Sequence, residues 1–385
     1  MNRPKICFIT AAEATMRVFL VEHFDAMVAK YDITAITNTD NTDFLKLLGL
    51  NLKVVPVSIE RKISPIHDVV SLFRLYFLFR KNHFNAVHSI TPKAGLLSML
   101  AAFFARIPVR IHTFTGQVWA IRNGAMRWLF KSADKLTASC ATHVLVDSRS
   151  QRDFLVQEGV VSAMKSSVIA NGSICGVDTQ RFALDQAQRK NIREKLSIKE
   201  SDIVFLFVGR LTLDKGLVDL AQAFVNVCAV HKNVHLVVVG PDEESMRARM
   251  SEHCGSYLDR IHFEEYTDKP EIFMSVADVF CLPSYREGFG MTIIEAASVG
   301  IPSIGARIYG ITDAIEEGTT GFLHAPGDVK GLSEMMFRMV EGPRERNEMG
   351  KKARERVMRL YSKQLVTSAF AEFHDAIFAS KPERT

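Results

Sequence analysis

Short apolar segments alternate with longer helical segments along most of the chain, and this alternation restricts the folds it can adopt. It predicts parallel strands in sheets with helices on both faces. In the first half, strands are expected at 5–10, 33–37, 53–57, 86–90, 110–115, 143–147 and 167–170. In the second half, they are expected near 203–208, 235–239, 260–263, 279–282, 302–305 and 321–324. Two such series in 385 residues predict two α/β domains.

A turn-rich segment is expected to join the two series. Residues 171–178 read Asn-Gly-Ser-Ile-Cys-Gly-Val-Asp and precede a polar run at 185–195, so a domain boundary is predicted near residue 180. Residues 362–378 are predicted to form a final helix. Its apolar positions are Leu365, Phe370, Phe373, Ile377 and Phe378.

Two cations follow the strand predicted at 203–208, in Gly209-Arg210 and Lys215-Gly216. A cation directly after a parallel strand lies at the carboxyl edge of the sheet, where α/β folds bind ligands. Arg210 offers a two-pronged donor and Lys215 a mobile point charge. Each could be a solvated loop cation, but the order of strand, cations and helix favours a diphosphate clamp.

Glu287 and Glu295 bracket a glycine-rich stretch in which a helix is predicted at 292–299. Gly288 and Gly290 let backbone N–H groups approach a ligand at the start of that helix, and a helix N-terminus favours negative charge. The spacing alone is equally consistent with one acid that complements the helix dipole and one solvated acid. Acids on both sides of an anion site suggest hydroxyl binding on both sides of a phosphate, as in a nucleotide-linked sugar.

These motifs together resemble those of the retaining glycosyltransferases of family 4, which have the GT-B fold. The motifs, in order, are Gly209-Arg210, Lys215-Gly216, Pro283-Ser284, Glu287-Gly288-Phe289-Gly290, Glu295-Ala296, Gly300-Ile301-Pro302 and Gly321-Phe322-Leu323. The resemblance covers nearly the whole chain and is strongest from about 200 to 330. Thr-Pro-Lys-Ala-Gly at 91–95 and the stretch 109–119 resemble bacterial enzymes that extend sugars on undecaprenyl diphosphate.

The resemblance implies two Rossmann-like domains that face each other across a cleft. Residues 1–180 would form an acceptor-binding, membrane-facing domain and residues 181–361 a nucleotide-sugar-binding domain. Residues 362–385 would form a helix that packs back on the N-terminal domain. The implied reaction moves a sugar, an N-acetylhexosamine or a related one, from a nucleoside diphosphate to a polyprenyl-diphosphate-linked saccharide. UDP is favoured over GDP by analogy alone.

The resemblance assigns Glu295 to the ribose hydroxyls and Glu287 to the donor sugar, with the leaving phosphate as the base in a front-face mechanism. Arg210 and Lys215 would stabilise the leaving diphosphate, because preorganised donors act strongly on developing charge. The remaining nucleotide contacts are expected at Gly209, Gly288, Phe289, Gly290 and Met291. No cofactor and no metal are expected, since the chain has no Asp-x-Asp pair in a suitable loop.

The N-terminal half departs from the family pattern at two loops. Relatives place a His-Gly pair after the fifth strand, whereas this chain has Thr115-Gly116 there and His112 three residues earlier. Either side chain could reach the donor sugar, or His112 could be a buried structural histidine. The first loop reads Ala-Ala-Glu-Ala-Thr at 11–15 instead of a Gly-Gly pair. Thr15 and Arg17 are still expected to face the acceptor diphosphate, together with Lys93.

Cations and large apolar residues alternate between Ser71 and Lys135. This stretch has ten Lys and Arg and a single acid, Asp134. Such a composition suits a surface that lies on anionic lipid, although core helices with snorkelling cations would look similar. The predicted membrane contacts are Arg74, Arg80, Lys81, Arg127 and Trp128.

Several other classes of protein are disfavoured. No nucleic-acid-binding module is recognisable, and the C-terminal half is acidic. Six Cys without a Cys-x-x-Cys pair indicate reduced thiols rather than a disulfide framework. The start of the chain does not resemble a signal peptide, and no apolar stretch is long enough to span a bilayer. A cytoplasmic protein, peripheral on the inner face of the membrane, is therefore expected.

Two other functions stay open. A sugar-nucleotide epimerase of GT-B fold would share the nucleotide site but needs no lipid-facing surface, so the basic aromatic stretch argues against it. A non-catalytic sugar-nucleotide-binding subunit would be expected to have lost at least one of the charged site residues. His231 and His235 have a possible metal-ligand spacing, but they span a predicted helix end and are expected to be structural.

Overall fold

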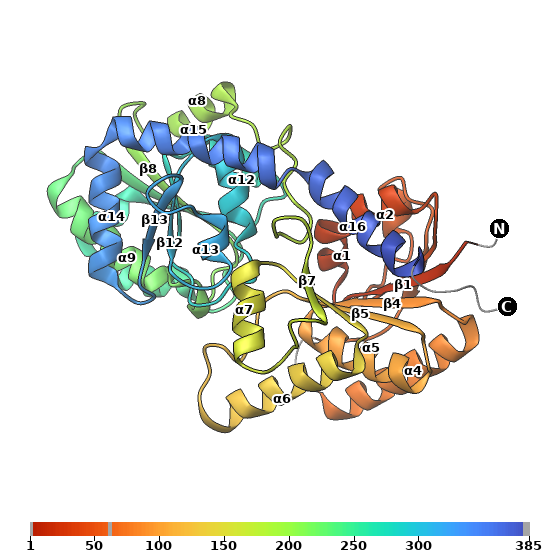
Figure 1. The fold of residues 1–385 in the computed structure, drawn as a ribbon. Helices are drawn as coiled ribbons and strands as arrows, with labels where there is room; N and C mark the ends of the chain where they lie inside the picture. Colours follow the sequence, from red (N-terminus) through yellow and green to blue (C-terminus); the bar gives the residue numbers. More distant parts are fainter. Residues whose placement is uncertain (1–2, 61–63, 380–385) are drawn as a thin grey trace. The chain divides into compact units, whose positions relative to one another are not determined.

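The computed structural model describes residues 3–60 and 64–379 and divides them into two compact units (Figure 1). Unit 1 contains the described residues up to Gly176 and those from Gln364 onward, and unit 2 is Val177–Lys363. Each unit has one parallel sheet, as the alternating pattern predicts. Their strands bury large aliphatic and aromatic side chains on both faces, which is typical of parallel sheets.

The sheet of unit 1 has the strand order β3-β2-β1-β4-β5-β6-β7. Its strands are β1 (Lys5–Ile9), β2 (Asp32–Thr37), β3 (Lys53–Pro56), β4 (Ala86–Ile90), β5 (Val109–Phe114), β6 (His143–Val146) and β7 (Ser166–Val168). The helices are α1 (Glu13–Phe19), α2 (Val21–Met27), α3 (Phe44–Leu47), α4 (Pro65–Asn82), α5 (Pro92–Phe104), α6 (Gly124–Cys140), α7 (Arg149–Gln157) and α16 (Lys363–Ala379). Ile6 of β1 pairs with Ile33 on one side and Ala86 on the other, so β1 is central.

Alternate side chains of β1 divide the helices of unit 1 between the two faces of the sheet. Phe8 contacts Phe24 of α2 and Phe370 of α16, with ring centroids 5.0 and 6.3 Å away. Cys7 and Ile9 point the other way, into a cluster with residues of α4 and α5. Figure 1 shows α1, α2 and α16 on one side of β1 and β4, with α4, α5 and α6 on the other.

Buried histidines fix α16 to the sheet of unit 1. His88 on β4 lies 3.2 Å from His374 on α16, measured between Nδ1 and Nε2. The ring of His23 on α2 stacks on Phe370 with centroids 4.0 Å apart. Burial lowers the pKa of both His23 and His374 to about 4, so both rings are neutral near pH 7.

The sheet of unit 2 has the order β10-β9-β8-β11-β12-β13. Its strands are β8 (Ile203–Val208), β9 (Val234–Val239), β10 (Ile261–Glu264), β11 (Val279–Leu282), β12 (Ser303–Ala306) and β13 (Gly321–His324). The α-helices are α8 (Gln186–Lys195), α9 (Leu217–Val230), α10 (Met246–Cys254), α11 (Pro270–Val276), α12 (Met291–Val299), α13 (Ile311–Ala314), α14 (Val329–Glu341) and α15 (Pro343–Leu360). Two short 3-10 helices are η1 (Leu213–Lys215) and η2 (Gly255–Arg260).

The polar run at 185–195 forms α8 rather than an extended linker. The Asp185 side chain caps this helix by accepting hydrogen bonds from the N–H groups of Ala187 and Gln188. The side chain of Arg193 is buried, and its Nη2 donates to Asp278 at 2.7 Å. An internal ion pair therefore holds a helix whose sequence is mostly polar.

Candidate active site

The loops after β8 and β11 are tied together at the carboxyl edge of the sheet in unit 2. β8 and β11 are neighbours, while β9, the next strand in sequence, lies on the other side of β8. Ligands bind at such switch points in α/β sheets. The Tyr285 N–H donates to the Asp214 carbonyl at 2.8 Å. Gly216, with φ of 68°, passes so near that a Cβ would lie 2.2 Å from the Pro283 carbonyl oxygen, so only glycine fits there.

Lys215 and Glu287 meet at this switch point. Nζ of Lys215 lies 2.5 Å from Oε1 of Glu287, and the Ser284 hydroxyl donates to the same oxygen at 2.9 Å. Both charged side chains are mostly buried. Within the described part of the chain, Oε2 of Glu287 accepts no hydrogen bond, which leaves one carboxylate oxygen for another donor.

Arg210 has a different acidic partner from Lys215. Its Nη1 donates to Oε2 of Glu243 at 2.9 Å, and the two side chains are 46% and 40% exposed. An exposed pair of this kind contributes little to stability. The structure gives Arg210 and Lys215 different carboxylate partners, so a joint diphosphate clamp stays a prediction.

Glycine backbone shapes the start of α12. Gly290 precedes the first residue of the helix with φ of 81°, a conformation that suits glycine. Gly310 packs so closely that a Cβ there would lie 2.4 Å from the carbonyl oxygen of Gly288. The Phe289 side chain is buried and contacts the Tyr361 ring. It therefore anchors the loop, and α12 begins two residues later at Met291.

A similar close approach fixes the loop after β8. A Cβ on Gly240, which follows β9, would lie 1.9 Å from the carbonyl oxygen of Gly209. The loops after two adjacent strands therefore pack backbone against backbone, which holds Gly209 at the carboxyl edge of the sheet.

Glu295 is a half-buried carboxyl group in the second turn of α12. Burial raises its pKa to about 7, and the positive charge of Arg181 only partly opposes this effect. Arg181 itself donates to Glu271 at 2.9 Å. Glu295 accepts no hydrogen bond within the described residues, so its oxygens are available to a hydroxyl donor.

The same edge has a second ion pair, which the sequence motifs do not predict. Nη2 of Arg286 donates to Oδ2 of Asp214 at 2.7 Å, and the Thr212 hydroxyl donates to Oδ1 at 2.6 Å. Burial alone would raise the pKa of Asp214, but these two donors outweigh it and the pKa lies below its ordinary value. Arg286 precedes Glu287 in the sequence, and its position between two motif residues was the one available signal.

In unit 1, the equivalent switch point lies between β1 and β4. Arg17 on α1 donates to Glu13 at 2.5 Å and lies over the Phe44 ring. Thr15 is half-buried two residues earlier on the same helix. Lys93, in the first turn of α5, lies 2.5 Å from Oδ1 of Asp68. The structure thus gives both expected acceptor cations an acidic partner from unit 1.

His112 and Thr115 have different environments. The His112 ring is fully buried, and its Nδ1 lies 2.9 Å from the Ser89 hydroxyl. A Cβ on Gly95 would lie 2.2 Å from this ring, so α5 covers it. Burial lowers the pKa of His112 to about 3. The geometry matches the structural alternative for His112, while Thr115 is half-buried in the loop directly after β5.

Asp147, directly after β6, is a buried acid for which the sequence motifs predict no role. It is buried, and its Oδ1 has no hydrogen-bond partner within the part of the chain that the structure describes. Burial raises its pKa to about 8, so the carboxyl group is mostly protonated at neutral pH. The side chain of Gln151 instead accepts from the backbone N–H of Asp147 at 2.8 Å.

The outer surface of α4 is apolar and basic. Ser71, Leu75 and Phe79 form its buried face, at intervals of four residues. Ile66, Val70, Phe73 and Phe77 form an exposed stripe, in which Phe77 is 65% exposed. The cations beside it are Arg74, Arg80 and Lys81, all exposed and without an acidic partner among the described residues.

The side chains of Trp128 and Arg127, both on α6, have different environments. Trp128 is 70% exposed. Arg127 lies over the Trp119 ring and donates to Glu158 at 2.9 Å, so its charge is used within the protein. The single acid of the basic stretch, Asp134, is buried and accepts from Trp119 Nε1 at 2.7 Å. Within residues 3–60 and 64–379, no helix is both long and apolar enough to cross a membrane.

No group of three or more His, Cys, Asp and Glu that could bind a metal occurs in the described residues. His231 and His235 have separate partners. Nε2 of His231 lies 3.3 Å from Glu341, whereas Nδ1 of His235 lies 3.1 Å from the His262 ring.

Comparison with known proteins finds two family models, one in each half of the chain. The model described as "Glycosyl transferase 4-like domain" matches residues 16–172, and "Glycosyl transferases group 1" matches residues 188–356. The capsular polysaccharide biosynthesis glycosyltransferase CapM of Staphylococcus aureus is 30% identical over 318 residues, which is 81% of this chain and 82% of CapM.

Two further proteins are similar over most of their length. The UDP-Gal:alpha-D-GlcNAc-diphosphoundecaprenol alpha-1,3-galactosyltransferase of Escherichia coli is 29% identical over 77% of each chain. The structure of HepE from Anabaena in complex with UDP and glucose superposes with a TM-score of 0.81 at 17% identity, over 97% of this chain and all of that one.

Proposed function

The chain belongs to the group 1 glycosyltransferases, and from this premise we propose that it moves a hexose or N-acetylhexosamine from UDP to a saccharide on polyprenyl diphosphate. The product would be an intermediate in the assembly of a surface polysaccharide or a glycoprotein glycan. The E. coli relative, whose name specifies a UDP-sugar and a diphosphoundecaprenol acceptor, supports both substrate classes.

The observation that carries the donor half is the Lys215–Glu287 pair at the β8–β11 switch point, beside the start of α12. The ammonium group of Lys215 has three donors and Glu287 uses one, so a phosphate oxygen can bind alongside. The first N–H groups of α12 favour the same negative charge. Oε2 of Glu287 then accepts from a hydroxyl of the donor sugar.

Glu295 fits the ribose. Two neighbouring ribose hydroxyls would donate to its oxygens, and hydrogen bonds of this kind favour the charged carboxylate. The raised pKa of Glu295 means that part of the free protein must lose a proton when UDP binds at neutral pH. Gly209 and Gly290 provide close backbone approach on either side of the diphosphate.

The proposed chemistry is transfer with retention of the anomeric configuration and without a metal. The bond between the sugar and the diphosphate breaks while Lys215, Arg210 and the N-terminus of α12 stabilise the leaving charge. The acceptor hydroxyl attacks from the same face and gives its proton to the leaving phosphate. Activity is expected to persist in EDTA, and complete loss that added Mg²⁺ or Mn²⁺ restores would contradict this part of the proposal.

Unit 1 is proposed to bind the acceptor at the membrane surface. Thr15, Arg17 and Lys93 lie at or next to the β1–β4 switch point, on α1 and at the start of α5. The exposed stripe of α4 and the Trp128 side chain would enter the headgroup region, while exposed cations attract anionic lipid. The protein would then act at the inner face of the cytoplasmic membrane.

A panel of UDP- and GDP-sugars with a polyprenyl-diphosphate-linked GlcNAc acceptor tests the function directly. The expected result is transfer from one UDP-sugar to the lipid acceptor, with release of UDP. Conversion of a UDP-sugar in the absence of acceptor would instead identify an epimerase. Binding of UDP-sugars with neither reaction, across lipid-linked acceptors of different terminal sugars, would indicate a non-catalytic subunit.

A further inference from the structure

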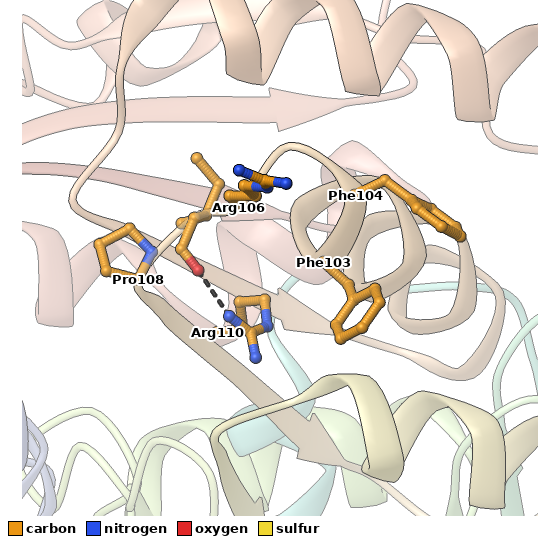
Figure 2. Close-up of a pocket in the computed structure, with 6 residues that line it drawn as sticks. Phe103, Phe104, Arg106, Pro108 and Arg110 are labelled. Carbon is orange, nitrogen blue, oxygen red and sulfur yellow. Dashed lines mark hydrogen bonds between the residues drawn. The ribbon is translucent and has the colours of Figure 1, made fainter.

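A pocket of about 600 Å³ lies in unit 1 (Figure 2). It is at the amino edge of the sheet, opposite to the carboxyl edge where the acceptor is proposed to bind. Its lining residues are Phe103, Phe104, Arg106, Ile107, Pro108 and Arg110. Arg110 is the second residue of β5, whereas Thr115 follows the last residue of that strand. Five residues of extended strand span roughly 16 Å. The pocket is therefore distinct from the proposed acceptor site.

The pocket has positive charge without an acid to balance it. Arg110 donates from Nε to the Cys140 carbonyl and from Nη1 to the Ile107 carbonyl, both at 2.6 Å. Nη2 of Arg110 and the whole Arg106 guanidinium make no hydrogen bond or ion pair within the described residues. The sequence contains no Asp or Glu between Asp68 and Asp134. Burial lowers the pKa of Arg110, and no carboxylate opposes this effect.

Two aromatic rings stand beside these cations. Phe103 and Phe104, at the end of α5, are 50% and 64% exposed, and their ring centroids lie 5.6 Å apart. The Arg110 guanidinium lies 5.6 Å from the centroid of the Phe103 ring. Figure 2 shows Phe103 next to Arg110, with Arg106 and Phe104 nearby. Exposed rings next to unpaired cations suit a ligand that is both anionic and apolar.

We propose that this pocket binds a phosphate ester that carries an apolar group. Arg106 and Nη2 of Arg110 would donate to the phosphate, because the planar guanidinium matches phosphate oxygens. Phe103 and Phe104 would contact the apolar group. The ligand comes either from a membrane lipid or from a soluble phosphate ester. None of these residues belongs to the proposed transfer site, so the pocket can be tested independently of the transfer reaction.

The backbone conformation of Arg106 allows a substitution that removes its charge without straining the turn. α5 ends in a turn in which the Arg106 N–H donates to Phe103 and the Ile107 N–H donates to Ala102. Arg106 has a left-handed φ of 59°, at a position where glycine is favoured. Arg106→Gly therefore removes the guanidinium while suiting the local backbone, and the melting temperature should stay the same or rise.

Titration calorimetry tests the site with two probes, dihexanoyl-phosphatidylglycerol below its micelle concentration and phenyl phosphate. Wild type should bind at least one of them, and Arg106→Gly and Phe104→Ser should each weaken binding about tenfold or more. Arg122→Gly, which removes an exposed cation outside the pocket, should bind like wild type.

The two probes also identify the source of the ligand. Binding of the lipid alone would assign the pocket to a membrane headgroup, whereas equal binding of phenyl phosphate would assign it to a soluble ester. Absence of binding by either probe, or equal binding by wild type and Arg106→Gly, would overturn the proposal. Inorganic phosphate that binds as tightly as both esters would overturn the apolar half of it.

Discussion

The two units share one architecture, yet their surfaces differ. Most of the exposed large hydrophobic side chains among the described residues belong to unit 1, and many lie on α4, α5 and α6. Unit 2 instead concentrates paired charges at the carboxyl edge of its sheet, where Lys215 pairs with Glu287 and Arg286 with Asp214. One parallel α/β design thus carries two different surfaces, and we assign donor binding to the loop edge of one and membrane contact to the outer helix faces of the other.

The largest expected effect concerns the charged edge of unit 2. Lys215→Ala should lower the rate of sugar transfer by about 10²–10³, the size expected when one preorganised charge-stabilising donor is lost. Arg210→Ala removes a second cation that stabilises the leaving charge, but one that is more exposed than Lys215, so it should lower the rate less than Lys215→Ala does. Steady-state kinetics on both folded variants checks this. A larger loss for Arg210→Ala would mean that the exposed cation is the main phosphate ligand.

The outer surface of unit 1 should give the next largest effect. The Arg74/Arg80/Lys81→Glu variant removes three cations that attract anionic lipid at about 1 kcal/mol each, so binding to anionic vesicles should fall about 100-fold or more. Phe77→Ser should weaken binding in a manner that salt does not change. Co-sedimentation with anionic and neutral liposomes measures both effects.

Unit 2 provides the control for that experiment. Leu258→Ser removes an exposed apolar side chain there and should leave vesicle binding unchanged. Equal sedimentation of wild type and all variants would show that the outer surface of unit 1 does not bind membranes more strongly than that of unit 2.

Glu295 should have a smaller effect, and one that depends on pH. Because its pKa is about 7, UDP affinity should decrease as the pH falls below 7, where the free protein holds a proton that binding must displace. Glu295→Gln should lower affinity roughly tenfold at pH 8 and flatten this part of the pH profile. Calorimetry across pH 6–8 tests the assignment, and a Gln variant with the wild-type profile would contradict it.

The smallest effect concerns His23 and His374, which are buried where α16 packs against the rest of unit 1. Their pKa values in the folded protein, about 4 for His23 and His374, lie below the ordinary value of 6.5. The unfolded chain therefore takes up protons first, and stability decreases as the pH falls from about 6.5 towards 4. His374→Asn should reduce this dependence by about 1 kcal/mol between pH 7 and 5.5.

Hydrogen exchange measures that effect locally. Peptides of α16 should lose protection on acidification in wild type and lose less in the variant, after correction for intrinsic rates. Peptides of α12 provide the comparison, because this helix of unit 2 has no histidine in its sequence. Equal acid sensitivity of α12 and α16 would show that the histidines of unit 1 are not responsible.

The fold class could be predicted well from sequence because strand period and apolar runs are local signals. The GT-B class and the family are confirmed by the family models and by the fold similarity to HepE. The strands expected at 203–208 and 279–282 coincide with β8 and β11. The strand expected at 167–170 is shifted, since β7 is Ser166–Val168.

The partners of site residues were less predictable, because they depend on tertiary contacts. The motifs placed Lys215 and Glu287 in one site, but their direct pairing follows from the adjacency of β8 and β11, which sequence order does not give. The burial of His112 depends on the missing Cβ of Gly95 on the neighbouring helix. The burial of Asp147 likewise follows from tertiary packing and from no motif in the sequence.

The division of unit 1 into two stretches of chain has a consequence for its synthesis. Unit 1 needs α16, but 187 residues of unit 2 are translated between Gly176 and Gln364. At roughly 5–20 residues per second, this delay is about 10–40 s. During that time the ring of His23 and the neighbouring face of the sheet lack the cover that α16 provides in the folded protein. The nascent chain thus presents an incompletely covered apolar surface to the cell until α16 has been synthesised.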